Sequence, residues 1–329
     1  MKLFNNNLKI KNILITGASG FIGSHFCELL LKNNYNVIGI DNFYNSSNKY
    51  IKNILKLKNF KFINSDVRDI YKNSKLFQKV DLVVHLASNT DIINSHDNPD
   101  ADYNNTLDTT NSILKLLKKN NIKNLIFSSS GACYGDLCIK NKVNEKSGPL
   151  IPLSTYAAAK ISSEALISSY SHLFGIKACV FRFGNVIGDR MSHGVIYDFI
   201  KRLKNDPSKL EIFGDGKQIK NYFLVDDCIN GMIKLFNNTK FDTEHPFEIY
   251  NIGSKSRTNV KKIAKIVLKE MKLFKTKIVI KGDKKAWPGD QPVVNFSTHK
   301  AQKNGWVCRI SSDDAVKKAT KLYLNNIFE

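Results

Sequence analysis

The sequence predicts an α/β fold in which a doubly wound parallel sheet carries a smaller, interleaved C-terminal lobe. Two observations predict it. Short β-branched runs alternate with longer amphipathic stretches through the first half of the chain, and this rhythm changes after residue 184. The chain has 329 residues, of which 42% are hydrophobic and 24% charged, as is typical of a globular protein with a sizeable core. Disorder and collagen-like repeats are therefore excluded.

The first half contains short strand-like runs separated by helical stretches. The expected strands are at 12–16, 36–40, 60–64, 82–87, 124–129 and 178–183. The expected helices are at 21–33, 103–119 and 156–174. This alternation fits a Rossmann-like, dinucleotide-binding architecture. We therefore expect residues 1–184 to form this domain, with a return segment near 219–252.

Residues 185–329 are expected to form a substrate-binding lobe that packs on the first domain. The residues after 184 are loop-like, and the expected elements then follow in a different order. They are helices at 195–204, 225–238, 259–273 and 312–325, and a strand at 277–281. No repeat, low-complexity linker or Pro/Gly-rich hinge separates the two parts, so we expect the lobe to be interleaved with the domain.

Charge and cysteine content narrow the class of protein. Lys and Arg number 50 against 29 Asp and Glu, a net charge of +21, but only six of the basic residues are Arg. A protein that reads nucleic acid uses Arg for bidentate contacts, so no nucleic-acid partner is expected. The six Cys have no zinc-ligand spacing, and no apolar run reaches the ~18 residues of a membrane span. We expect a cytoplasmic protein with no metal site and no membrane partner.

A glycine-rich turn follows the first expected strand. Gly17, Gly20 and Gly23 have the spacing GxxGxxG and open the first helix. Glycines there allow the backbone to approach a pyrophosphate closely, at the positive end of that helix. Asp41 ends the second strand, where a carboxylate can accept both hydroxyls of an adenosine ribose and repels a 2′-phosphate. The pattern predicts NAD rather than NADP as the cofactor.

Tyr156 and Lys160 form a YxxxK pair at the start of the third expected helix. An i, i+4 pair lies on one helix face, so the phenol and the ammonium can approach one substrate. A phenol with a pKa of about 10 is a poor base at neutral pH, but a nearby ammonium and a positive nicotinamide ring favour the phenolate. Ser130 ends the fifth strand and can hydrogen-bond the same substrate oxygen. We expect these three residues to be catalytic.

In combination these motifs resemble the extended short-chain dehydrogenase/reductase family, specifically its nucleotide-sugar epimerase/dehydratase branch. The resemblance rests on TGASGFIG at 16–23, FSSSGACYG at 127–135 and YAAAK at 156–160. It continues through HLAS, RFGNVIG, GDGKQIKNY and VDD, at 85–88, 182–188, 214–222 and 225–227. The motifs are in order and correctly spaced over most of the chain.

The resemblance implies a set of site residues. For the cofactor they are Gly17, Gly20, Phe21, Ile22, Gly23, Asp41, Asn42, Asn45, Ser46, Asp66, Val67, Leu86, Ala87, Ser88, Asn105, Tyr156 and Lys160. For the substrate they are Ser88, Ser130, Asn185, Val195, Gln218, Lys220 and Tyr222. The helices at 103–119 and 156–174 are where relatives dimerise, so a homodimer is expected.

The two residues after Ser130 distinguish the reactions of this branch. In its 4,6-dehydratases they are Asp and Glu, the acid and base of water loss, and its decarboxylases keep the Glu. Here they are Gly131 and Ala132, neither of which can move a proton. The resemblance therefore implies epimerisation at C4 of a nucleotide-activated sugar through a transient 4-keto intermediate. A nucleotide 4-ketosugar reductase or C4 oxidase is the alternative, and a non-catalytic dinucleotide-sensing or nucleic-acid-binding protein is the alternative of another class.

Several positions bear on the substrate. Lys220 stands where the family usually has Arg, and Lys284 and Lys285 lie near the place of another Arg. Lys can neutralise a diphosphate, but without a planar bidentate fork. Val294 falls near a position where some 4-epimerases have a bulky side chain, which favours a larger sugar here. His193 is interpreted either as a substrate contact or as an exposed loop residue. By contrast, His85 in HLAS is expected to be a packed residue at a strand end.

Overall fold

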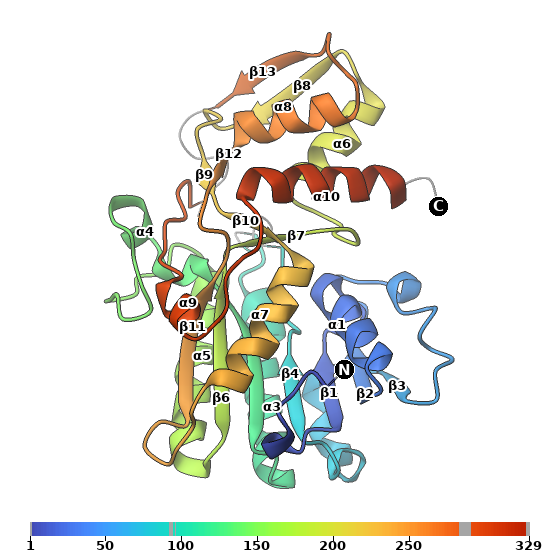
Figure 1. The fold of residues 1–329 in the computed structure, drawn as a ribbon, viewed down its shortest axis with the longest axis vertical. Helices are drawn as coiled ribbons and strands as arrows, with labels where there is room; N and C mark the ends of the chain where they lie inside the picture. Colours follow the sequence, from blue (N-terminus) through green and yellow to red (C-terminus); the bar gives the residue numbers. More distant parts are fainter. Residues whose placement is uncertain (1, 92–94, 96, 283–290, 327–329) are drawn as a thin grey trace.

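A seven-stranded parallel sheet forms the centre of the larger lobe (Figure 1). The structure is a computed structural model that describes all residues except 1, 92–94, 96, 283–290 and 327–329. The strand order is β11-β6-β5-β4-β1-β2-β3, and every neighbouring pair is parallel. The strands are β1 Asn12–Thr16, β2 Asn36–Asp41, β3 Phe60–Asn64, β4 Leu82–His85, β5 Asn124–Ser130, β6 Lys177–Phe183 and β11 Phe247–Ile252. The order reverses between β1 and β4, and ligands of doubly wound sheets bind at the carboxyl ends of the strands at such a point.

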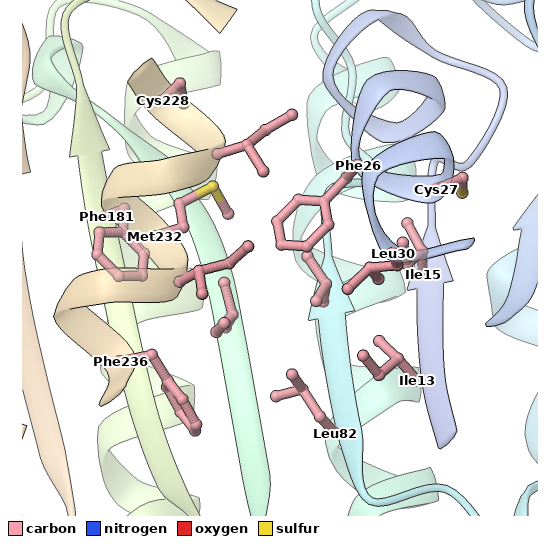
Figure 2. Close-up of a cluster of buried hydrophobic side chains, with 14 of the residues drawn as sticks. Ile13, Ile15, Phe26, Cys27, Leu30, Leu82, Phe181, Cys228, Met232 and Phe236 are labelled. Atoms are coloured by element: carbon pink, nitrogen blue, oxygen red, sulfur yellow. The ribbon is translucent and has the colours of Figure 1, made fainter. Parts of the chain in front are cut away.

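Helices cover both faces of the sheet. On one face lie α1 (Phe21–Lys32) and α7 (Val225–Asn238), and on the other α3 (Thr109–Asn120) and α5 (Thr155–Phe174). Figure 2 shows the first of these layers, in which Phe26 and Leu30 of α1 and Met232 and Phe236 of α7 pack over the sheet. The strands are buried on both faces, which is why they appear in the sequence as continuous apolar runs.

The smaller lobe lies beyond the carboxyl ends of the strands and has its own core (Figure 1). It contains the parallel pair β8 and β13, together with α6, α8 and α10. Their bounds are α6 Val195–Asn205, β8 Lys209–Phe213, α8 Val260–Glu270, β13 Lys277–Lys281 and α10 Ser312–Asn326. Phe199, Leu210 and Val267 are among the side chains of this core.

The chain passes between the two lobes more than once. Two short pairs lie at the junction, β7 (Asn185–Ile187) with β10 (Tyr222–Leu224), and β9 (Ile219–Lys220) with β12 (Thr258–Asn259). Near the end of the chain, the carbonyl oxygen of Pro292 accepts from the backbone N–H of Ile219 at 2.8 Å. A few residues on, the N–H of Ser297 donates to Val143 of the larger lobe at 2.7 Å. The smaller lobe is therefore interleaved with the larger one.

Short helical segments complete the fold. Turns of 3₁₀ helix are at Asn6–Leu8, Asn48–Tyr50, Val67–Phe77 and Gly131–Tyr134. Short α-helices are at α2 Asp100–Asp102, α4 Leu137–Lys140 and α9 His299–Lys303, and Tyr103–Asp108 form a π-helical turn. In the described ranges, no helix has both the length and the apolar character that a membrane crossing requires.

The expected doubly wound architecture is confirmed, with differences in particular elements. The sheet has a seventh strand, β11, which lies in the expected return segment but was not expected as a strand. Its sequence FEIYNI is interrupted by two polar residues: Glu248, in the half-buried first part of this edge strand, and Asn251, which is buried. The helix expected at 103–119 begins earlier, at Asp100, and includes the π-helical turn. The helix expected at 259–273 ends at Glu270, because Lys272 has a left-handed backbone with φ of +59°.

Candidate active site

The turn between β1 and α1 can be formed only by glycines at two positions. Gly17 has φ of +69°, and a Cβ there would lie 2.9 Å from the backbone nitrogen of Ala87. A Cβ at Gly23 would lie 2.0 Å from the carbonyl oxygen of Gly17, which is closer than atoms can approach. The turn therefore packs Gly17 against the backbone that follows β4, and the first turn of α1 packs against Gly17. This is the geometry that binds a phosphate group at a helix N-terminus.

Asp41 lies beside this turn at the end of β2. Its Oδ2 atom accepts from the backbone N–H of Ser19 at 3.0 Å. Its Oδ1 atom accepts from the N–H of Phe43 at 2.9 Å and from the hydroxyl of Ser46 at 2.8 Å. The carboxylate is therefore fixed next to the glycine turn, in the place where a ribose of a bound dinucleotide is recognised.

The turn and Asp41 line a cavity of about 500 Å³ at the carboxyl ends of the strands. The structure brings every residue expected to bind the cofactor to the wall of this one cavity: Gly17, Gly20, Phe21, Ile22, Gly23, Asp41, Asn42, Asn45, Ser46, Asp66, Val67, Leu86, Ala87, Ser88, Asn105, Tyr156 and Lys160. The volume lies in the range of cofactor pockets. The cavity has backbone N–H groups and a carboxylate at one end, and a phenol with an ammonium at the other. This arrangement fits a nicotinamide dinucleotide.

One face of α5 contacts the end of β5. The hydroxyl of Ser154 accepts from the backbone N–H of Ala157 at 3.2 Å, so the helix begins just before Tyr156. One turn further, the Lys160 ammonium donates to the carbonyl oxygen of Ser128 at 2.7 Å. This ammonium lies 5.8 Å from the centre of the Tyr156 ring. The strand end and the helix face thus hold the phenol and the ammonium side by side at the cavity wall.

Burial shifts the pKa values of both groups. It raises the pKa of the Tyr156 phenol above its ordinary value, and hydrogen bonding with the Ser130 side chain acts in the opposite direction. It also lowers the pKa of Lys160 to about 8, although the nearby Cys133, Glu164 and Asp102 counteract this shift. At neutral pH Lys160 is therefore still mainly protonated, while Tyr156 is a phenol whose deprotonation needs further positive charge beside it.

The substrate-side residues are spread over both lobes. Ser88 lines the cavity, whereas Ser130 is not among the lining residues but hydrogen-bonds the side chain of Tyr156, which is. Asn185 and Tyr222 lie opposite each other in the β7–β10 pair. Val195 begins α6 of the smaller lobe, and Gln218 and Lys220 lie at the junction of the lobes; none of the three is among the residues that line the cavity. Lys284 and Lys285 lie outside the described residues. The binding roles of all these residues stay predictions.

Other single residues can now be placed. His85 is fully buried, with Nδ1 2.7 Å from the Thr16 hydroxyl and Nε2 3.1 Å from that of Thr110. Burial lowers the pKa of His85 to about 3, so it is a neutral packed residue, as expected. His193 lines the cavity. Val294 is buried against Tyr134 and Phe296 and does not line the cavity described here.

Sequence reasoning missed several cavity residues. They are Ser19, Tyr44, Ser47, Tyr50, Thr90, Thr109, Ser128, Ser129, Phe183, Val186, Arg190, Met191 and Ser192. Arg190 extends over α1, where its guanidinium donates to Glu28 at 2.9 Å. The loop GDRMSHG directly follows β7, so its position after a strand end was the signal that could have identified Arg190 to Ser192.

A doubly wound sheet with a nucleotide cavity over its strand ends, and with a tyrosine–lysine pair at the far wall, defines an enzyme class. Members of this class oxidise or reduce a substrate with a bound dinucleotide. The model of the NAD dependent epimerase/dehydratase family matches residues 13–253. The chain therefore belongs to this family, and NAD is its cofactor.

Individual relatives and solved structures agree with this assignment. A putative UDP-glucose 4-epimerase of Methanocaldococcus jannaschii is 33% identical over 95% of this chain and 99% of the relative. A dTDP-D-glucose 4,6-dehydratase of Dictyostelium discoideum is 30% identical over 80% of this chain and 63% of the relative. The crystal structure of UDP-glucuronic acid 4-epimerase from Bacillus cereus, in complex with UDP-glucuronic acid and NAD, superposes with a TM-score of 0.84. It is 28% identical and covers 96% of this chain and 99% of that one. The chain is thus an epimerase/dehydratase-type enzyme of nucleotide sugars.

Proposed function

We propose that the protein inverts the configuration at C4 of a nucleotide-activated sugar. The observation that carries this proposal is the turn after Ser130, where Gly131 and Ala132 offer no acid or base. Gly131 is enclosed, since a Cβ there would lie 2.9 Å from the Phe296 ring and 3.0 Å from the carbonyl oxygen of Phe183. Oxidation at C4 and its reversal need only the hydroxyl, phenol and ammonium that the site contains, whereas water loss needs a further acid and base.

The carboxylates of the cavity wall support the same choice. Among the described lining residues they are Asp41 and Asp66, at the ends of β2 and β3. β2 lies three strands from β5 in the sheet, which corresponds to roughly 14 Å at ~4.8 Å per strand. Neither carboxylate is therefore placed to act as the acid or base of a dehydration near Tyr156.

Each residue of the set has a separate role in the proposed reaction. Tyr156 removes the proton of the C4 hydroxyl as its phenolate and later returns it. Ser130 hydrogen-bonds the same oxygen and orients it, and the Lys160 charge favours the phenolate. The residues of the cavity wall would hold NAD, which would supply a reversible hydride acceptor for C4. Because the nucleoside diphosphate anchors the substrate, the 4-keto sugar can turn in the site without escaping, and hydride returns to its other face.

We also propose that the chain forms a homodimer through α3 and α5 and acts in the cytoplasm. Two large apolar side chains support the dimer, because they are exposed near these helices. Tyr103 precedes α3 and is 58% exposed, and Leu173 at the end of α5 is 70% exposed. Light scattering on the purified protein tests the dimer.

One experiment tests the proposed reaction. The purified protein is denatured and the released NAD is assayed, and the native protein is screened with UDP-, GDP-, CDP- and dTDP-hexoses for inversion at C4. We expect bound NAD, inversion of at least one sugar and no net formation of NADH. Stoichiometric consumption of NAD(P)H would instead indicate a ketosugar reductase. Elimination of water from the sugar would indicate a dehydratase and contradict the proposal.

A further inference from the structure

Asp102 is a buried carboxylate that the proposed chemistry does not use. It is the last residue of α2, and only 1% of its surface is exposed. Its Oδ1 atom accepts from the Asn89 side-chain amide at 2.9 Å, and its Oδ2 atom accepts from the Thr155 hydroxyl at 2.7 Å. Burying a carboxylate costs free energy unless hydrogen bonds compensate it. Here the compensating donors come from two segments that border the cavity.

One of these donors, Asn89, belongs to the loop after β4. Its backbone N–H donates to the Thr106 hydroxyl at 3.2 Å, and its side-chain oxygen accepts from Asn45 at 3.3 Å. The preceding residue, Ser88, lies 2.8 Å from the same Thr106 hydroxyl. Ser88 and Asn45 both line the cavity. Asn89 itself is buried behind the cavity wall, and the side chain that Asp102 holds therefore supports two of the wall residues from behind.

The other donor, Thr155, is the first residue of α5 and directly precedes Tyr156. On its own element, Asp102 directly precedes the π-helical turn Tyr103–Asp108, which contains the cavity residue Asn105. Turns of π-helix are rare and occur often at functional sites. One carboxylate thus joins three segments: the loop after β4, the π-helical turn and the start of the helix that carries Tyr156.

We propose that Asp102 is a positioning residue that holds Tyr156 and Lys160 in their working geometry through the Thr155 and Asn89 contacts. This inference rests on the proposed function only in naming the reaction that the pair performs. The carboxylate itself does not line the cavity, so it acts through Thr155 and Asn89 rather than on substrate.

The electrostatics of the site support this role. The Asp102 charge raises the pKa of Tyr156 and also that of Lys160. Cys133 raises both pKa values in the same direction, Glu164 raises that of Lys160, and buried His85 faces Lys160 as a neutral group. If the Asp102 charge is removed, both pKa values fall. The pH profile of activity is then expected to move to lower pH.

Three variants of the holoenzyme separate position from charge. Asp102→Asn removes the charge and mismatches one of the two hydrogen bonds. Thr155→Val removes the contact to α5 and keeps the charge. Asp100→Asn makes the same charge change at an exposed residue of the same short helix and is the matched control. We expect Asp102→Asn to lower kcat roughly 10- to 100-fold with little change in KM, because a small displacement of a catalytic group has effects of this size. Thr155→Val should lower kcat without changing the pH dependence of activity.

A measurement without turnover completes the test. The tyrosinate absorbance of each holoenzyme, minus that of the same variant with Tyr156→Phe, reports the pKa of Tyr156. We expect this pKa to fall in Asp102→Asn and to be unchanged in Thr155→Val and Asp100→Asn. Because no sugar is added, this titration decides the role of Asp102 even if no substrate is turned over. The proposal would be overturned if Asp102→Asn had the same Tyr156 pKa and the same kcat as Asp100→Asn. It would also be overturned if Thr155→Val left kcat unchanged.

Discussion

Glu164 and Arg182 form a two-point ion pair in the core, one helical turn beyond Lys160. The Arg182 Nε–H donates to Oε1 of Glu164 at 3.0 Å, and the Arg182 Nη2–H donates to Oε2 at 2.6 Å. Glu164 also accepts from the hydroxyl of Ser129. The α5 face thus contacts three successive serines at the end of β5: Tyr156 contacts Ser130, Lys160 contacts Ser128 and Glu164 contacts Ser129. The ion pair thus fixes α5 on β6, and the Ser129 contact fixes it on the end of β5, which carries Ser130.

Glu164→Gln is expected to destabilise the protein strongly. It leaves the Arg182 guanidinium, which is 3% exposed, without its counter-charge in the core. Loss of one partner of a buried ion pair costs about 3–5 kcal/mol in the free energy of unfolding. The double variant Glu164→Leu/Arg182→Met removes both charges and should recover part of this loss. Urea unfolding measures both, and a double variant less stable than Glu164→Gln would contradict this interpretation of the pair.

Tyr156→Phe is expected to keep its NAD and to lose turnover. In the proposed reaction the phenol moves the proton, and loss of such a group lowers the rate by roughly 10²- to 10⁴-fold. The ring itself remains in place at the cavity wall, so cofactor binding should persist. Tyr170→Phe, further along the same helix and packed against Phe174, is the control and should retain full activity. Activity of Tyr156→Phe near that of the control would exclude Tyr156 as the base.

Gly23→Ala is expected to abolish NAD binding. Its Cβ would lie 2.0 Å from the carbonyl oxygen of Gly17, so the turn between β1 and α1 must open. Gly20→Ala is a graded comparison, because its Cβ would lie 3.2 Å from the same oxygen and a small shift accommodates it. The NAD content after purification, assayed on denatured protein, should therefore be lowest in Gly23→Ala. Equal NAD content in the two variants would show that close packing of this turn does not control cofactor binding.

The glycine turn could be predicted from the sequence because its requirement is local. Gly17 needs a positive φ and Gly23 needs the absence of a side chain, and both requirements leave a mark in the residue type itself. The same is true of Tyr156 and Lys160, since helical spacing alone places them on one face. Asp41 is predictable in a similar way. It ends a strand that is parallel to the one before the glycine turn, and parallel strands end at the same edge of the sheet.

Asp102 could not be predicted, because its role depends on contacts between distant segments. Its partners Asn89 and Thr155 are 13 and 53 residues away along the chain, and no spacing rule joins them. The edge strand β11 was missed for a related reason. The strand is only half-buried at Glu248, and the buried Asn251 accepts a hydrogen bond from the distant Tyr134 hydroxyl, so two polar residues interrupt the apolar run that marks a central strand.

Lys160 is expected to make the stability of the NAD-free protein rise with pH. Burial lowers its pKa to about 8 in the folded chain, whereas an unfolded lysine has a pKa of about 10.4. Between these values the unfolded chain binds more protons than the folded chain, so the free energy of unfolding increases with pH. At pH 10 the increase attributable to Lys160 is about 2.5 kcal/mol relative to pH 7.

Urea unfolding of wild type and Lys160→Met at both pH values measures this increase, because the difference between the two proteins cancels the other titrating groups. Lys115→Met, at an exposed position on α3, is the control and should give a curve parallel to that of wild type. If the free energy of unfolding of Lys160→Met changes with pH as that of wild type does, Lys160 has the same pKa in the folded and unfolded chains. That result would contradict the prediction.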